Sequence, residues 1–132
     1  MSEPIWKVIA AQKQADRLAK IPPEWTLPDT LLPPKETDFV QDFPRTSGFF
    51  TDRELQLTEA TASEVVTRIA AGEWTALEVT TAVCKRAAVA QQLLNCVTEI
   101  CFEEGIARAK ELDEYFSREG KTVGPLHGLP IR

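Results

Sequence analysis

The chain has 132 residues, of which 43% are hydrophobic and 27% charged, proportions typical of a globular domain. Its formal net charge of −5 disfavours binding to nucleic acid or anionic membranes, because both require clustered Lys and Arg. No segment approaches the roughly 18 apolar residues that a membrane-spanning helix needs, and the N-terminus lacks a secretory pattern. We therefore expect a cytoplasmic protein with no nucleic-acid or membrane partner.

Cysteine and histidine are scarce and do not form a metal-binding pattern. The chain contains Cys84, Cys96, Cys101 and a single histidine, His127, with no C-x-x-C spacing. Structural zinc needs four such ligands at close spacing, so we expect no metal and no other cofactor. The cysteines are predicted to be reduced structural thiols. A nucleophilic role for Cys84 or Cys101 is disfavoured because neither lies near a Gly-rich turn.

Proline divides the chain into two parts. Seven of the nine prolines lie at or before Pro44, and the others are Pro125 and Pro130. The first segment, from Pro4 to Lys20, has the apolar spacing of an amphipathic helix. Residues 22–44 mix prolines with large apolar side chains, which permits a flexible linker but favours an extended arm lying on another surface. We predict a first unit at 1–57, with this helix and arm, and a second at 58–132.

Three further helices are predicted between residues 61 and 120. Thr61 with Glu64, and Thr75 with Glu78, have the T-x-x-E spacing of capping boxes, in which side chains satisfy free backbone donors at the start of a helix. Apolar residues then recur at helical spacing, and small or turn-forming residues follow. The predicted helices cover residues 61–72, 75–94 and 102–120.

Residues 96–101 read Cys-Val-Thr-Glu-Ile-Cys, a short β-branched stretch that predicts a strand, and Ile131 could open a second one. A strand followed by a helix and another strand is the start of a βαβ unit. We therefore expect an α/β protein that is mostly helical, with one or two strands of an incomplete mixed sheet. The predicted unit is cut before its second strand is complete, which suggests a truncated domain.

Several motifs resemble those of the amidase signature family. The sequence G-P-L-H-G-L-P-I at 124–131 is similar to a segment that in the family leads into a strand bearing a catalytic lysine. Residues 75–80, Thr-Ala-Leu-Glu-Val-Thr, resemble the family's T-A-x-E-V-T helix. Residues 21–25, 84–88 and 91–100 look like the fungal acetamidase branch in particular. The resemblance covers nearly the whole chain and is weakest at 26–42.

This resemblance implies the N-terminal, mostly helical portion of an α/β/α fold. It also implies hydrolysis of small carboxylic amides such as acetamide, to acid and ammonia, by a Ser–cis-Ser–Lys triad. The expected lysine and both serines lie beyond Arg132, so the chain alone is expected to be inactive. In the full-length enzyme the implied partners are a small amide and a second copy in a homodimer. The alternatives are a non-catalytic interaction fragment and a truncated gene product.

The candidate site residues are those of the loop that leads to the catalytic strand of the family: Gly124, Pro125, His127, Gly128 and Pro130. Gly and Pro make such a loop rigid while requiring special backbone angles. His127 has two interpretations. It is either a structural histidine bonded to the backbone of its own loop, which we favour, or a group that orients the loop or touches a substrate cleft.

Overall fold

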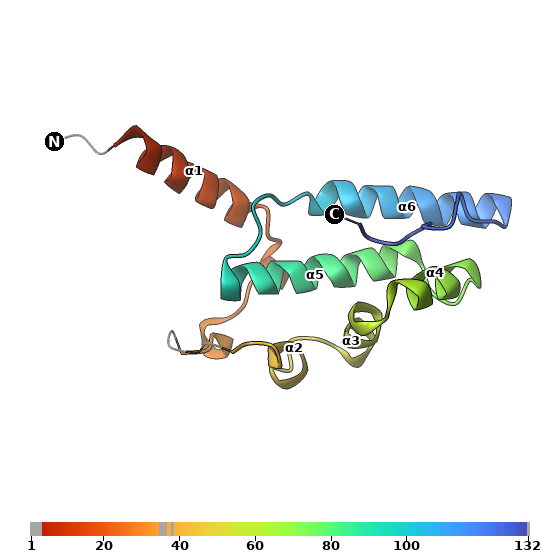
Figure 1. Cartoon of the computed structure of the whole chain (residues 1–132), viewed down its shortest axis with the longest axis horizontal. Coiled ribbons are helices and arrows are strands. Elements are labelled where there is room, and N and C mark those ends of the chain that lie inside the picture. Colours follow the sequence, from red (N-terminus) through yellow and green to blue (C-terminus); the bar gives the residue numbers. More distant parts are fainter. Residues whose placement is uncertain (1–3, 35–36, 38, 132) are drawn as a thin grey trace.

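The computed structural model describes residues 4–34, 37 and 39–131, and throughout these residues the regular structure is helical. The elements in chain order are α1 (Ile5–Ala19), η1 (Pro23–Trp25), η2 (Asp29–Leu31), α2 (Phe43–Thr46), α3 (Asp52–Glu59), α4 (Ala62–Ala70), α5 (Ala76–Leu94) and α6 (Phe102–Glu119). Figure 1 shows α5 and α6 running side by side, with α3 and α4 beyond α5 and α1 projecting from the body. The four long helices predicted from the sequence are confirmed to within three residues at each end.

Helix α5 lies at the centre because its faces are apolar and its N-terminus is fully capped. Thr75 and Glu78 form the predicted capping box, and Asn95 ends the helix in the left-handed conformation. One face packs with α3 and α4 around Trp74. That cluster contains Leu57, Val65, Ile69, Trp74, Val79 and Ala82. Burial of these side chains is the main stabilising contribution in this part of the molecule.

Helices α5 and α6 are joined by a contact that the sequence did not predict. The Asp113 carboxylate on α6 accepts hydrogen bonds from the backbone N–H groups of Ala76, at 2.7 Å, and Leu77, at 2.9 Å. These are free donors of the first turn of α5, where a negative charge is also favoured by the helix dipole. Asp113 therefore caps α5 from a neighbouring helix and fixes the relative position of the two.

The proline-rich segment begins by lying against α5. Trp25 is buried and packs edge to face on Phe102, with ring centroids 5.6 Å apart. The Gln92 side chain accepts from Leu27 N–H at 2.8 Å and donates to the Trp25 carbonyl at 2.9 Å. Residues 21–27 thus behave as an arm held on the surface of the same chain, whereas a linker would make few such contacts.

The strand predicted at 96–101 is wrong. Side chains, rather than the backbone of a neighbouring strand, form hydrogen bonds with the backbone of this segment. Gln91 Oε1 accepts from Val97 N–H at 2.7 Å. Arg17 donates to the Val97 carbonyl at 2.7 Å, and Lys20 donates to the Ile100 carbonyl at 2.9 Å. Ile131, the proposed start of a second strand, is also irregular. The fold prediction is correct for a mostly helical chain, but its strands are not found in the part of the chain that the structure describes.

Two further differences concern helix starts. Helix α3 was not predicted, although Thr51 and Glu54 form a complete capping box at its start. At α4 the Thr61 side chain accepts from Glu64 N–H, but the reciprocal bond of a capping box is not formed. Helix α3 crosses the boundary predicted between residues 57 and 58, and the division into two units stays a prediction.

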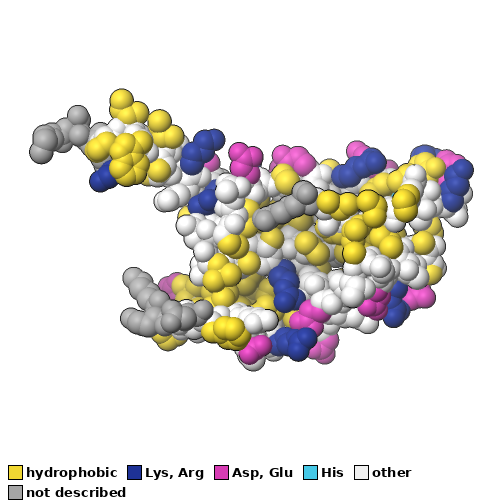
Figure 2. Space-filling view, in the orientation of Figure 1, with side chains coloured by type: hydrophobic (Ala, Val, Ile, Leu, Met, Phe, Trp, Pro, Cys, Tyr) yellow, Lys and Arg dark blue, Asp and Glu magenta, His cyan; other side chains and the backbone are white. Residues whose placement is uncertain are grey.

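Helix α1 buries none of its side chains. Figure 2 shows apolar atoms gathered on this projecting helix, where Ile5 is 78% exposed and Trp6 66%. The helix is held at its C-terminal end, through the hydrogen bonds of Arg17 and Lys20 to residues 95–100. Among the described helices, none has both the length and the apolar character needed to cross a bilayer.

Candidate functional site

The loop at 123–131 is seated on the start of α5 and the end of α4. Gly128 makes the closest approach: a Cβ atom there would lie 2.8 Å from Ile69 Cδ1 and 2.9 Å from Ala76 Cβ. Its φ is +75°, a conformation that side-chain-bearing residues rarely adopt. Gly124, by contrast, has an ordinary φ and open space around it. Of these two glycines, Gly128 has the special backbone angle that was predicted, and Gly124 does not.

His127 is 3% exposed and faces inward from this loop. Its Nδ1 accepts a hydrogen bond from Val123 N–H at 3.1 Å, within its own loop, as the structural interpretation expects. Since Nδ1 is an acceptor, the neutral ring carries its proton on Nε2. Nε2 is buried and has no hydrogen-bond partner among the described residues. The Phe116 ring packs against the imidazole, with centroids 5.9 Å apart.

Burial lowers the pKa of His127 below its ordinary value, because the charged imidazolium is poorly solvated inside the protein. Asp113 acts in the opposite direction, and the positive charge of Arg108 adds to the lowering. His127 is therefore neutral at pH 7. In this form it can accept at Nδ1 and donate at Nε2, which suits positioning of a neighbouring group.

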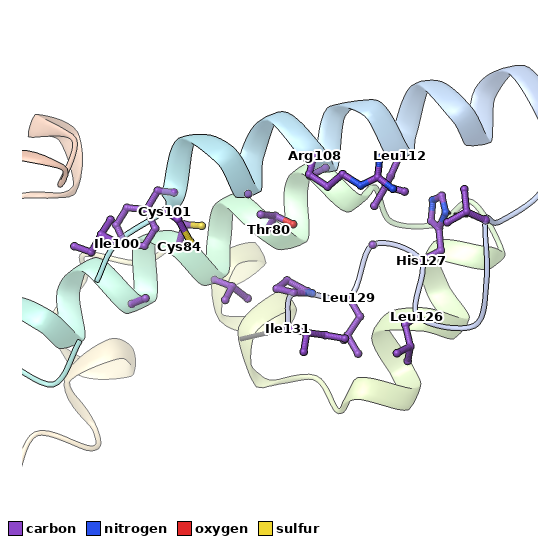
Figure 3. Close-up of a pocket in the computed structure, with 18 of the residues that line it drawn as sticks. Thr80, Cys84, Ile100, Cys101, Arg108, Leu112, Leu126, His127, Leu129 and Ile131 are labelled. Carbon is purple, nitrogen blue, oxygen red and sulfur yellow. Dashed lines mark hydrogen bonds between the residues drawn. The ribbon is translucent and has the colours of Figure 1, made fainter. Parts of the chain in front are cut away.

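A cavity of about 630 Å³ opens between α5, α6, residues 97–101 and the loop at 123–131 (Figure 3). All five candidate loop residues line it: Gly124, Pro125, His127, Gly128 and Pro130. Most of the other lining side chains are apolar, and the polar exceptions include Thr80, Glu99 and Arg108. The His127 side chain thus bonds its own loop, as the structural interpretation expects, and it also borders a cavity. Its contact with a substrate stays a prediction.

Helix α6 provides a side of the cavity that was not predicted from the sequence. Gly105, Arg108, Ala109 and Leu112 recur every three or four residues and line the cavity from one face of the helix. Arg108 is the charged member of this set. Its charge acts on His127, 19 positions further along the chain, so the link could not be read from local sequence.

The described residues do not assemble a hydrolytic centre. Their Ser and Cys side chains make no hydrogen bond to a Lys or His that could serve as a base. The Cys84 thiol has its pKa raised to about 11 by burial and by the nearby Cys101, so it is a poor nucleophile at neutral pH. Arg132, after which the catalytic lysine was expected, lies outside the described residues. What the cavity offers is a mainly apolar surface bordered by a neutral imidazole and by a few polar side chains, among them Glu99 and Arg108.

Comparison with known proteins finds similar sequences among amidases. The family model described as Amidase matches residues 78–132. The protein kk1C of Curvularia clavata is 70% identical over 131 residues, which cover 99% of this chain and 24% of kk1C. The acetamidase of Emericella nidulans is 54% identical over 127 residues, which cover 96% of this chain and 22% of that enzyme.

A solved structure agrees with these sequence matches. Fatty acid amide hydrolase superposes on 91% of this chain with a TM-score of 0.81 and 36% identity, and the matched part is 22% of that protein. The chain spans about a quarter of the length of the relatives it matches. The family match at residues 78–132 and the alignments over nearly the full length of this chain show that it is similar to members of the amidase family.

Proposed function

We propose that this chain serves amide hydrolysis, as the part of an amidase that positions the loop at 123–131. The substrate class is small carboxylic amides such as acetamide, whose C–N bond is cleaved to give acid and ammonia. The chain's own contribution is the scaffold: α5 and α6 hold the loop, and the loop presents His127 beside an apolar cavity. The lysine and serines of the catalytic triad are supplied by sequence outside these 132 residues.

The observation that carries this proposal is that the segments similar to amidases are also those that form the cavity wall. Relatives aligned along nearly the whole chain include an enzyme named acetamidase. The segment at 124–131, one of those that resemble the family, is also the one in which Gly128 packs closely against α4 and α5. Residues 78–132, which match the family model, contain most of the cavity wall.

A chimera tests the proposal directly. Residues 1–132 replace the aligned segment of the Emericella nidulans acetamidase, to which they are 54% identical. We expect the purified chimera to release ammonia from acetamide at a rate within about tenfold of the parent enzyme. The 132-residue chain alone is expected to release none above background. A soluble chimera with the thermal stability of its parent but no activity would contradict the proposal.

Helix α1 supports a second candidate, a non-catalytic interaction module. Its apolar side chains, among them Ile5, Trp6, Val8 and Ile9, are each more than half exposed. A surface of this kind commonly marks a protein contact. If this candidate holds, the isolated chain added to the parent acetamidase forms a mixed complex visible by size-exclusion chromatography. Exchange of Ile5 and Ile9 for Ser would abolish that complex, whereas the amidase proposal requires no such complex.

A further inference from the structure

Two of the three cysteines meet at the same end of the cavity. Cys84 lies in the middle of α5, and Cys101 immediately precedes α6. Both line the cavity, and Figure 3 shows their side chains next to each other. The Cys101 thiol is close enough to Cys84 to add to the effect of burial in raising the pKa of Cys84. The segment at 95–101 turns back after α5 and brings them together.

The third cysteine is placed differently. Leu94, the last residue of α5, is ten helical positions from Cys84, or about 15 Å at the rise of an α-helix. Cys96 lies two residues beyond Leu94. It is exposed and is not part of the cavity wall. A disulfide requires Cα atoms within roughly 7 Å, which disfavours Cys96 and leaves Cys101 as the partner for Cys84.

We propose that Cys84 and Cys101 are a site of reversible oxidative modification, at which a low-molecular-weight disulfide such as glutathione disulfide converts the two thiols into an intramolecular disulfide. This inference is independent of amide hydrolysis. The bond would tie the middle of α5 to the start of α6 at this end of the cavity. Its formation would fix the separation of the two helices that form the cavity walls.

The reaction has two exchange steps. Cys101, which is the more exposed of the two, attacks one sulfur of glutathione disulfide as a thiolate; the S–S bond breaks and one glutathione leaves as a thiolate. Cys84 then loses its proton and attacks the Cys101 sulfur, and the second glutathione leaves. The pair loses two electrons and two protons, and glutathione disulfide gains them as two molecules of glutathione. The second step is the slow one, because the Cys84 thiol is half-buried and rarely ionised.

Peptide mapping identifies the bond that forms. The 132-residue chain is incubated with glutathione disulfide, free thiols are blocked with N-ethylmaleimide, and the protein is digested with trypsin and a Glu-specific protease. Cleavage after Lys85, Arg86 and Glu99 places the three cysteines on separate peptides. We expect the Cys84 and Cys101 peptides to be joined in at least fivefold excess over any other pair. Cys96→Ser should leave this bond unchanged, and Cys84→Ser or Cys101→Ser should each remove it.

Repeating the reaction in 6 M guanidinium chloride shows whether the fold or random contact in an unfolded chain determines which disulfide forms. Cys96 and Cys101 are five positions apart and Cys84 and Cys101 are seventeen, so loop closure in an unfolded chain favours the shorter pair by roughly sixfold. We expect the preferred bond to change from Cys84–Cys101 in buffer to Cys96–Cys101 in denaturant. The same bond pattern in both conditions, a predominant Cys96 link in buffer, or three blocked thiols after oxidation would overturn the inference.

Discussion

Replacing Gly128 by Ala tests how the loop is held. The new Cβ would lie 2.8 Å from Ile69 Cδ1 and 2.9 Å from Ala76 Cβ, and 3.3 Å from Ala76 Cα, which is backbone and cannot rotate away. Overpacking of this kind costs roughly 1–3 kcal/mol. A side chain at φ +75° adds about 1–2 kcal/mol of backbone strain. We expect the free energy of unfolding to fall by about 2–5 kcal/mol, and the melting temperature to fall by roughly 6–20 °C.

The fluorescence of Trp74 provides the assay, since this side chain is buried in the cluster that contains Ile69. Gly124→Ala is the matched control: it lies in the same loop, has an ordinary φ and meets no atom within 4 Å. Its effect should be within about 1 kcal/mol and can be stabilising. Ile69→Val removes the atom nearest to the new Cβ. The double variant with Gly128→Ala should therefore be destabilised by less than the sum of the two single variants. Equal melting temperatures for Gly128→Ala and Gly124→Ala would refute the steric argument.

Three further variants test the other contacts. Asp113→Ala leaves the first N–H groups of α5 without their acceptor and should cost about 1–2 kcal/mol, measured by urea unfolding. The lowered pKa of His127 means that the unfolded chain takes up this proton first. The contribution of neutral His127 to the free energy of unfolding is fully present above pH 6.5. Below that pH it declines by at most about 1.4 kcal/mol per pH unit, and His127→Asn should remove this pH dependence. Burial favours a raised pKa at Glu54, but its bonds to Lys85 and Thr51 outweigh burial and lower the pKa. Lys85→Met should therefore raise the Glu54 pKa in a carboxyl NMR titration, and no change would show that Lys85 is not the cause.

The elements that could be predicted are those specified by nearby residues. The boundaries of α5 follow from Thr75 and Glu78 at one end and Asn95 at the other, all within or next to the helix. The same kind of signal at Thr51 and Glu54 would have predicted α3. These bonds join residues three positions apart, so the amino-acid order alone contains the necessary information.

The errors arise where distant side chains replace backbone partners. Residues 96–101 have the composition of a strand, but Arg17 and Lys20 bind the carbonyls of that segment from 80 positions away. Nothing local indicates these two partners. The cap that Asp113 gives to α5 crosses 37 positions and was missed for the same reason. At the site, local sequence does not indicate which nitrogen of His127 carries the proton, because that depends on the Val123 N–H in the folded loop.

The two interpretations of His127 are compatible once the loop is seen as a single rigid unit. Gly128 fixes the loop against Ala76 at the start of α5, and Asp113 caps the same turn from α6. With Nδ1 occupied by Val123 N–H, the proton on Nε2 is held in a buried position without a partner among the described residues. A buried donor left unpaired costs about 1–3 kcal/mol, so an acceptor that reaches Nε2 recovers that free energy. The structural bond at Nδ1 therefore leaves Nε2 as a buried donor that is available to an acceptor.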